Sequence, residues 1–130
     1  MITTNELRIG NIVDCKINGL TERRSITAIG SQDNVYFGDI TYTVDSVYPI
    51  PLTAALLEAC GFKKNEDLRY SNIWYFIKDR FTITQLRHGW QVSYGLYDSI
   101  AIIWEGVLFV HQLQNLHFAL TNQELPMVIV

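Results

Sequence analysis

Apolar and polar positions alternate in short runs along the first 50 residues. Val13, Cys15 and Ile17 alternate with the polar Asp14 and Lys16, which is the two-residue period of a strand with one buried face. The pattern predicts further strands over 20–29, 35–37, 40–44 and 47–51, with a one-turn break at 45–46. Small SH3-like barrels show this order of elements, so we expect an SH3-like β-barrel over residues 1–52, an analogy that concerns the fold and not the function.

A tight turn is expected between the first two of these strands. Asn18 and Gly19 follow the first alternating run, and an Asn-Gly pair tolerates the positive φ angles of a two-residue hairpin turn. The sequence therefore predicts a β-hairpin that returns at Leu20.

The first helix is expected over 54–60. Thr53 is a suitable N-cap residue, because its side-chain oxygen can accept a backbone N–H of the first turn. Gly61 stands where a left-handed residue ends a helix, and Phe62 follows it to contact Leu57.

The rest of the chain predicts an antiparallel sheet and a second helix. The charged stretch 63–67 is expected to be a loop and the boundary between the two halves. Strands are expected over 68–77, 81–86, 90–94 and 100–104, within the range 68–108. The last of them is apolar on both faces, which is typical of a central strand. Residues 53–130, with helices over 53–61 and 109–121, are thus expected to form an α+β subdomain that packs with the barrel as one compact unit.

The second helix has an apolar arc of about 120° at 100° per residue, which can lie on a sheet. Its members are Phe109, Val110, Leu113, Leu116, His117 and Leu120. We expect His117 to be a hydrogen-bonded core histidine and Asn122 to take the left-handed position after the helix.

Other residues of this helix point away from the arc. His111 is expected to be solvated or a surface contact. Gln112, Gln114 and Asn115 are expected on a wet face, where amides could also read bases or a peptide backbone. Phe118 is expected to pack under the barrel, with an oligomer contact as the alternative.

Composition and charge narrow the classes of protein. The chain has 130 residues, of which 48% are hydrophobic and 18% charged, and this excludes disorder by composition. A formal net charge of −3 argues against a protein whose main task is to hold phosphate backbones. The longest apolar runs, 100–104 and 107–110, fall short of the ~20 residues that span a bilayer. We find no secretory signal at the start and expect a cytoplasmic protein without a membrane partner.

The reactive residue types do not form a recognisable centre. Cys60 stands at the C-terminal end of the first predicted helix, where the helix dipole disfavours a thiolate. We therefore expect Cys60 and Cys15 to be core residues. His111 and His117 lie about 240° apart around a helix, and His88 falls in a predicted turn. We expect no catalytic residue, no metal site and no cofactor.

Three segments resemble a family of small uncharacterised proteins encoded by phages and prophages of Bacteroidetes bacteria. The segments are 6–11 (ELRIGN), 49–53 (PIPLT) and 110–121 (VHQLQNLHFALT). Their order and spacing cover nearly the whole chain. The chain departs from the family at His117, where the family has Tyr, and at Asn122, where it has Gly. The resemblance implies a phage or mobile-element protein in the bacterial host cytoplasm, and no mechanism.

The function that we favour from the sequence is a non-catalytic binding module for a protein partner. One alternative is a nucleic-acid-binding module, in which barrel cations stand beside tyrosines that could stack on bases. Others are a small enzyme with a site that sequence does not reveal, and a virion or assembly component. A homo-oligomer could form through the apolar tail 127–130. The expected interaction surface comprises Arg23, Arg24, Tyr36, Tyr48, His111, Gln114, Asn115 and Phe118.

Overall fold

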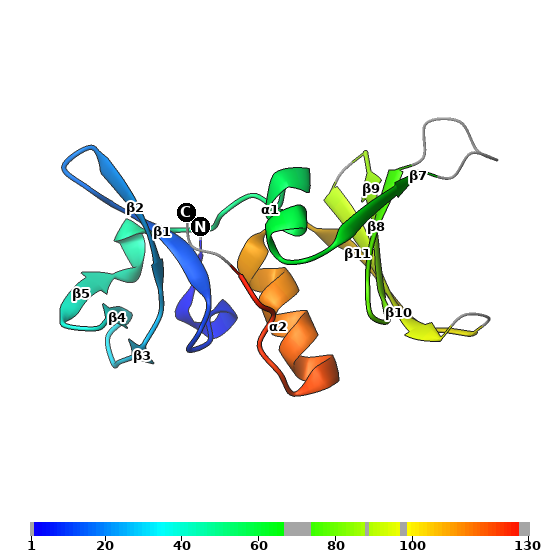
Figure 1. Ribbon diagram of the computed structural model, residues 1–130. Helices are drawn as coiled ribbons and strands as arrows, with labels where there is room; N and C mark the ends of the chain where they lie inside the picture. Colours follow the sequence, from blue (N-terminus) through cyan, green and yellow to red (C-terminus); the bar gives the residue numbers. More distant parts are fainter. Residues whose placement is uncertain (1, 67–73, 88, 97–98, 128–130) are drawn as a thin grey trace. The chain divides into compact units, whose positions relative to one another are not determined.

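The computed structural model describes residues 2–66, 74–87, 89–96 and 99–127 (Figure 1). It has the predicted α+β fold, with antiparallel sheets and two α-helices among the described residues. The chain divides into two compact units. The first comprises Met1–Pro51 together with Phe109–Val130, and the second comprises Leu52–Leu108.

This division differs from the expected one at the C-terminal helix, which we had placed with residues 53–108. A backbone hydrogen bond of 2.9 Å joins the Val110 N–H to the Ile50 carbonyl, and Pro51 forms an antiparallel bridge with Phe109. These contacts join the start of the helix to the end of the N-terminal strands. Periodicity within the helix carries no information about which segment it joins.

The first unit contains two three-stranded sheets. One has the order β2 (Leu20–Ser25), β1 (Ile12–Ile17), β6 (Val47–Tyr48), and the other has the order β3 (Ala28–Ile29), β4 (Asn34–Phe37), β5 (Ile40–Thr43). Among the described residues these sheets do not join into a closed barrel. Asn18 and Gly19 have φ angles of 52° and 79° and join β1 to β2, as the sequence predicts.

The predicted strand over 20–29 is interrupted, because the chain changes partners there. The Ile26 N–H donates to the Asn11 carbonyl at 2.9 Å, beside β1, whereas the Thr27 N–H donates to the Tyr36 carbonyl at 2.9 Å, in β4. The first half of the segment therefore belongs to one sheet and the second half to the other. Alternation alone does not show such a change.

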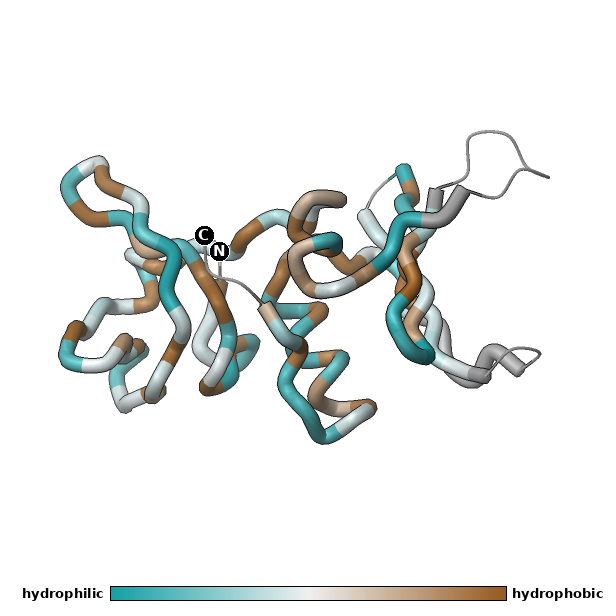
Figure 2. Tube along the Cα trace, viewed as in Figure 1, coloured by the Kyte–Doolittle hydropathy of each residue, from teal (hydrophilic) through white to brown (hydrophobic). Residues whose placement is uncertain are grey.

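One apolar core cluster of this unit contains residues from both of its sheets. Val13 and Cys15 of β1 and Val47 of β6 are buried in the same cluster as Val35 and Phe37 of β4. In Figure 2 brown and teal positions follow one another along β1. The unit also contains the short 3-10 helices η1 (Thr4–Glu6) and η2 (Val44–Ser46) and the helix α2 (Val110–Thr121).

Helix α2 begins without the side-chain oxygen of a Ser, Thr, Asp or Asn cap. Its N-cap is Phe109, whose N–H donates to Oε1 of Gln112 at 3.0 Å. At the other end Asn122 has a φ of 57° and donates its N–H to the Phe118 carbonyl, which confirms the predicted left-handed end.

The second unit begins with the helix α1 (Ala54–Ala59). The Leu56 N–H donates to Oγ1 of Thr53 at 3.2 Å, and the Phe62 N–H donates to the Leu57 carbonyl at 3.0 Å. Gly61 has a φ of 94°. Both predicted ends of this helix are therefore confirmed.

A five-stranded antiparallel sheet follows α1. Its order is β11 (Ser99–Val107), β10 (Gly89–Leu96), β9 (Phe81–Leu86), β8 (Trp74–Lys78), β7 (Lys63–Glu66). Phe76, Ile83 and Val92 stand in one row across three strands and are buried. The indole N–H of Trp90 donates to the Leu52 carbonyl at 3.1 Å.

Two predictions about this sheet are wrong. The segment 63–66, predicted as a loop, is strand β7 at one end of the described sheet. Charged residues are common on edge strands, where they discourage pairing with other chains, so its composition resembles that of a loop. Strand β11, predicted to be central, stands at the other end. Apolar residues on both faces of a strand indicate what packs above and below the sheet. They do not indicate whether another strand pairs with it on each side. Residues 68–73 of the strand predicted over 68–77 lie outside the described residues.

The described helices are also too short or too polar to cross a membrane.

We predict that Thr53→Ala lowers the free energy of unfolding by about 1 kcal/mol, because the Leu56 N–H loses its acceptor. Thr53→Ser keeps the hydroxyl and should stay close to the parent. Urea titration of the three proteins measures this. Equal losses in both variants would show that the threonine methyl group, and not the cap, matters.

Candidate interaction surface

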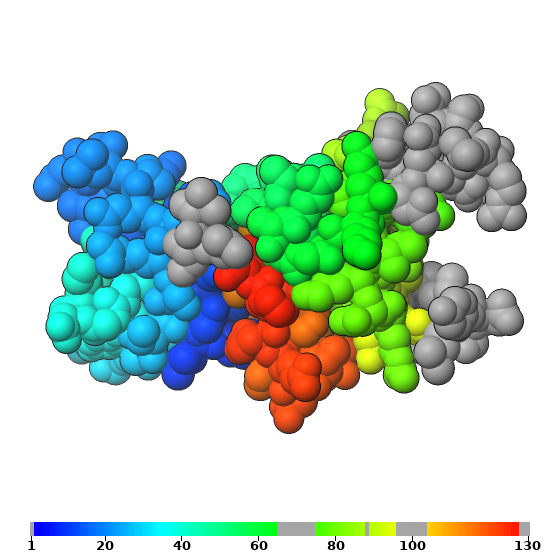
Figure 3. Space-filling model, viewed as in Figure 1, coloured from blue at the N-terminus to red at the C-terminus, as the bar shows by residue number. Residues whose placement is uncertain are grey.

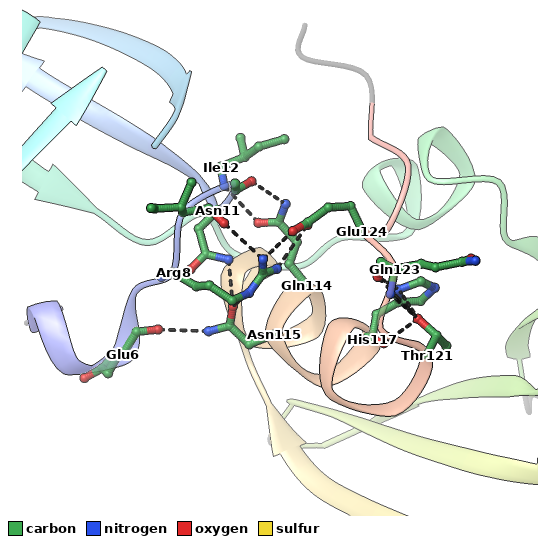
Figure 4. Close-up of polar contacts among 12 residues, drawn as sticks. Glu6, Arg8, Asn11, Ile12, Gln114, Asn115, His117, Thr121, Gln123 and Glu124 are labelled. Atoms are coloured by element: carbon green, nitrogen blue, oxygen red, sulfur yellow. Dashed lines mark hydrogen bonds and ion pairs between the residues drawn. The ribbon is translucent and has the colours of Figure 1, made fainter. Parts of the chain in front are cut away.

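Gln114 connects α2 to the start of β1, although we expected it on a solvated helix face. Its side chain is 1% exposed. Oε1 accepts the Ile12 N–H at 2.8 Å, and Nε2 donates to the Gly10 carbonyl at 3.2 Å (Figure 4). The Gln114 side chain thus supplies the hydrogen bonds of the Ile12 N–H and the Gly10 carbonyl, which have no backbone partner among the described residues. Because both of its polar atoms are used in this way, Gln114 is not available to a ligand.

Asn115 is also used inside the protein. Its Oδ1 accepts from Nδ2 of Asn11 at 2.7 Å and from Nε of Arg8 at 3.2 Å, and its Nδ2 donates to the Glu6 carbonyl at 2.9 Å. Asn11 is fully buried, and its Oδ1 accepts the Arg8 N–H at 2.7 Å. These amides hold the segment before β1 against α2, so the expectation of a wet amide face is wrong.

Phe118 contacts Arg8 of the N-terminal segment. The guanidinium carbon lies 4.3 Å from the centroid of the Phe118 ring, a cation–π geometry. The same guanidinium pairs with the Glu124 carboxylate and, through hydrogen bonding, lowers the pKa of that carboxyl group. The prediction places Phe118 under the N-terminal barrel, and the contact observed is with Arg8, in the segment that precedes β1.

His111 is buried, where we expected it to be solvated or a surface contact. It is 1% exposed, its ring stacks on Phe109 with centroids 5.9 Å apart, and neither ring nitrogen has a hydrogen-bond partner among the described residues. Burial lowers its pKa, and the Glu6 carboxylate, 3.6 Å from Nε2, opposes this shift. His117, by contrast, is a hydrogen-bonded core histidine as predicted, with Nδ1 2.8 Å from the Gln123 carbonyl oxygen.

Both thiols are core residues, as predicted. Burial raises the pKa of Cys15 and that of Cys60 to about 11. A thiol is a nucleophile as its thiolate, so both are poorly suited to nucleophilic catalysis. No three His, Cys, Asp or Glu side chains converge within the described ranges, and His88 lies outside them.

The basic residues of the first hairpin already have acidic or aromatic neighbours. Nε of Arg23 lies 3.2 Å from Oδ1 of Asp14, and Nε of Arg24 lies 2.8 Å from Oε2 of Glu22. Nζ of Lys16 stands 4.6 Å from the centroid of the Tyr48 ring. The ring of Tyr48 thus already faces a cation of its own unit.

Tyr36 does not join this group. It lies on β4 in the other sheet, with its ring against Gly30. The structure therefore brings together Arg23 and Tyr48, both opposite Asp14 in the β1 register, and leaves Tyr36 apart.

The tip of the β1–β2 hairpin exposes apolar residues beside a hollow. Leu20 is 71% exposed and Ile17 is 43% exposed. A half-open hollow of about 180 Å³ adjoins them, and its lining consists of Cys15, Ile17, Asn18, Leu20, Glu22 and Tyr42. In Figure 3 the blue hairpin atoms stand above the cyan atoms of β5 at the left of the view. Exposed apolar side chains next to a hollow are typical of a binding surface.

The outer side of β2 carries backbone groups that point away from β1. Asn11 and Ile26 continue the register of the ladder and share a backbone hydrogen bond. Bonded and non-bonded pairs alternate along an antiparallel ladder, so even-numbered residues of β2 bond to β1. The amide and carbonyl groups that face outward belong to Thr21, Arg23 and Ser25, which we call the β2 edge.

Within the described part of the chain, the β2 edge has no neighbouring strand. Sequence reasoning found the hairpin but missed this edge. Because the turn at Asn18 and Gly19 has two residues, Leu20 pairs with Ile17 and every second residue of the returning strand bonds to β1. This spacing could have shown which backbone N–H groups of β2 face outward. It could not have revealed that the last short strand would pair with β1 on its other side.

Comparison with protein-family models, with curated proteins and with solved structures finds no significant match to this chain.

We predict that Gln114→Met lowers the free energy of unfolding by about 2 kcal/mol, because it leaves a buried N–H and a partly buried carbonyl unpaired at nearly constant side-chain volume. Gln123→Met, at an exposed position, is the matched control. Urea titration gives both values. A loss in Gln114→Met no larger than in the control would contradict the assigned role.

We predict that His111 makes the protein less stable as the pH falls below about 6.5. The unfolded chain takes up a proton on this imidazole near its ordinary pKa of 6.5, while the buried ring stays neutral to a lower pH, so acid favours the unfolded state. Between about pH 7.5 and about pH 5.5 His111→Phe should lose part of this dependence, at most ~1.4 kcal/mol per pH unit. Parallel urea titrations measure the difference, and identical pH profiles would refute the prediction.

Proposed function

We propose that this chain is a non-catalytic binding module that takes an extended segment of a protein partner along the β2 edge. The observation that carries the proposal is the set of outward amide and carbonyl groups of Thr21, Arg23 and Ser25, directly beside the exposed Leu20. An exposed edge of this kind is a template for an additional strand.

Strand addition would divide affinity and selectivity between two features. Main-chain hydrogen bonds to the β2 edge supply affinity without regard to sequence. The hollow beside it, with Cys15 and Tyr42 in its lining and Glu22 as its carboxylate, selects among side chains of the incoming strand. Most of this lining is apolar, and Glu22 is paired with Arg24 of its own strand, which favours a partner strand with apolar residues on one face.

We also propose that the first unit is an SH3-like small barrel and that the protein belongs to a phage or prophage and acts in the bacterial host cytoplasm. The order of elements supports the first proposal, because η2 precedes a last short strand, β6, that pairs antiparallel with β1. The three sequence segments named above support the second.

The contacts of the hairpin give less support to a nucleic-acid partner. Arg23 and Arg24 each lie against a carboxylate of the same hairpin. A phosphate would have to compete with these carboxylates for the guanidinium groups, and affinity for nucleic acid comes largely from unmatched basic side chains.

We predict that peptides selected from a random library for binding to the full chain lose affinity at least about tenfold in Thr21→Pro, a change of ~1.4 kcal/mol. Proline removes the outward N–H at an edge position without removing a ladder bond to β1. Thr21→Ala keeps the N–H and is the matched control.

Isothermal titration measures the affinities, and amide shifts in NMR spectra locate the bound peptide. Binding to Thr21→Pro at parental affinity, or amide shifts that avoid β2, would exclude this surface.

A further inference from the structure

We propose that the strand taken by the β2 edge is β2 of a second copy of the chain, so that two first units share one continuous antiparallel sheet. This inference rests on the proposed function and names its partner. Strand β2 is the hexapeptide Leu-Thr-Glu-Arg-Arg-Ser over Leu20–Ser25. This sequence is complementary to a second copy of itself when the two-fold axis that relates the two strands passes through Arg23.

The hydrogen-bonding groups fit this register. With Arg23 opposite Arg23 of the second copy, Thr21 stands opposite Ser25. Three outward-facing positions of one strand then meet three outward-facing positions of the other. Directly opposed residues of this set form the hydrogen-bonded pairs of an antiparallel ladder, and each such pair exchanges two backbone bonds.

The charges on one face also fit. Glu22 stands opposite Arg24 of the second copy, in a non-hydrogen-bonded pair, where opposed side chains come closest. Glu22 already bonds to Arg24 of its own strand, with Nε 2.8 Å from Oε2. Two copies therefore bring four charges together with alternating sign, an arrangement that stabilises cross-strand pairs.

Other registers are worse. A shift of two residues in one direction places Glu22 opposite Glu22, and a shift in the other direction places Arg24 opposite Arg24. Like charges directly opposite each other destabilise a sheet. A shift of one residue places Glu22 of one copy and Arg24 of the other on opposite faces of the shared sheet. The pattern thus selects one register among those that the edge allows.

The other face carries the cost of this register. Arg23 faces its own copy across the dyad, but each guanidinium has the Asp14 carboxylate on its far side, 3.2 Å from Nε. Across the four strands, an acidic residue, two basic residues and an acidic residue therefore follow one another on this face. On the face of Glu22 and Arg24, the apolar Leu20, 71% exposed in the single chain, lies diagonal to Arg24 of the second copy, whose aliphatic stem covers part of it.

Charge exchange tests this proposal with the full chain in sedimentation equilibrium. We expect a concentration-dependent dimer for the parent. Glu22→Arg and Arg24→Glu, each alone, make the four clustered charges alike and should weaken the dimer at least about tenfold. The double variant restores alternating signs and should return to within about threefold of the parent. Far-UV circular dichroism verifies folding of each variant.

A cysteine placed on the dyad tests the register directly. Opposed residues of a hydrogen-bonded pair have Cα atoms about 5.5 Å apart, within the range that a disulfide spans. Mild oxidation should therefore link Arg23→Cys into a covalent dimer. Thr21→Cys, which stands opposite Ser25, should stay unlinked. The native Cys15 and Cys60 are buried, so the parent serves as the background.

The outcomes separate this inference from the proposed function. A parent that stays monomeric at millimolar concentration, or a dimer that neither charge reversal weakens, overturns the second copy as partner. If the Thr21→Pro variant nevertheless loses the selected peptides, the edge still binds a strand, and only the identity of its occupant is wrong. A dimer that survives Thr21→Pro overturns the edge itself as the dimer contact.

Discussion

The first unit depends on hydrogen-bond partners for the backbone N–H and carbonyl groups of β1. On one side β1 pairs with β2 and on the other with β6, and at its start, where strand pairing stops, the side chain of Gln114 accepts the Ile12 N–H and binds the Gly10 carbonyl. An unpaired buried amide is costly, so these contacts fix where β1 begins and which helix lies beside it. Because β1 is occupied on both sides, the edges of this sheet are β2 and the much shorter β6, so its longer described edge is that of β2.

The same constraint explains why α2 has polar residues in buried positions. A helical wheel assigns amides to the solvated face, since they are usually found there. In this unit the helix faces the ends of strands and an irregular N-terminal segment, where unpaired amide and carbonyl groups need partners. Gln114 and Asn115 meet that need, and Asn11 joins the second of them to the segment before β1. Apolar side chains could have filled the volume but would have left those groups without hydrogen bonds.

Features set by neighbouring residues could be predicted from the sequence, and features set by distant pairing could not. The turn at Asn18 and Gly19, the cap at Thr53 and the left-handed Asn122 each depend on a few adjacent residues, and all three are observed. The edge positions of β7 and β11, the transfer of α2 to the first unit and the burial of His111 depend on which segments meet across the chain. The candidate surface shows the same division: its hairpin was predictable, and its unpaired edge was not.

An exposed edge strand normally carries charge to prevent unwanted pairing, and the charges of β2 are compatible with that role. Their order adds a second property. A strand with charges of one sign would repel every copy of itself, whereas Glu22 and Arg24, two residues apart on one face, repel in shifted registers and attract in one. In the proposed dimer, protection against unspecific pairing and the selection of one register come from the same side chains. Asp14, on the neighbouring strand, completes the arrangement, because it supplies the charge that lets Arg23 approach its own copy.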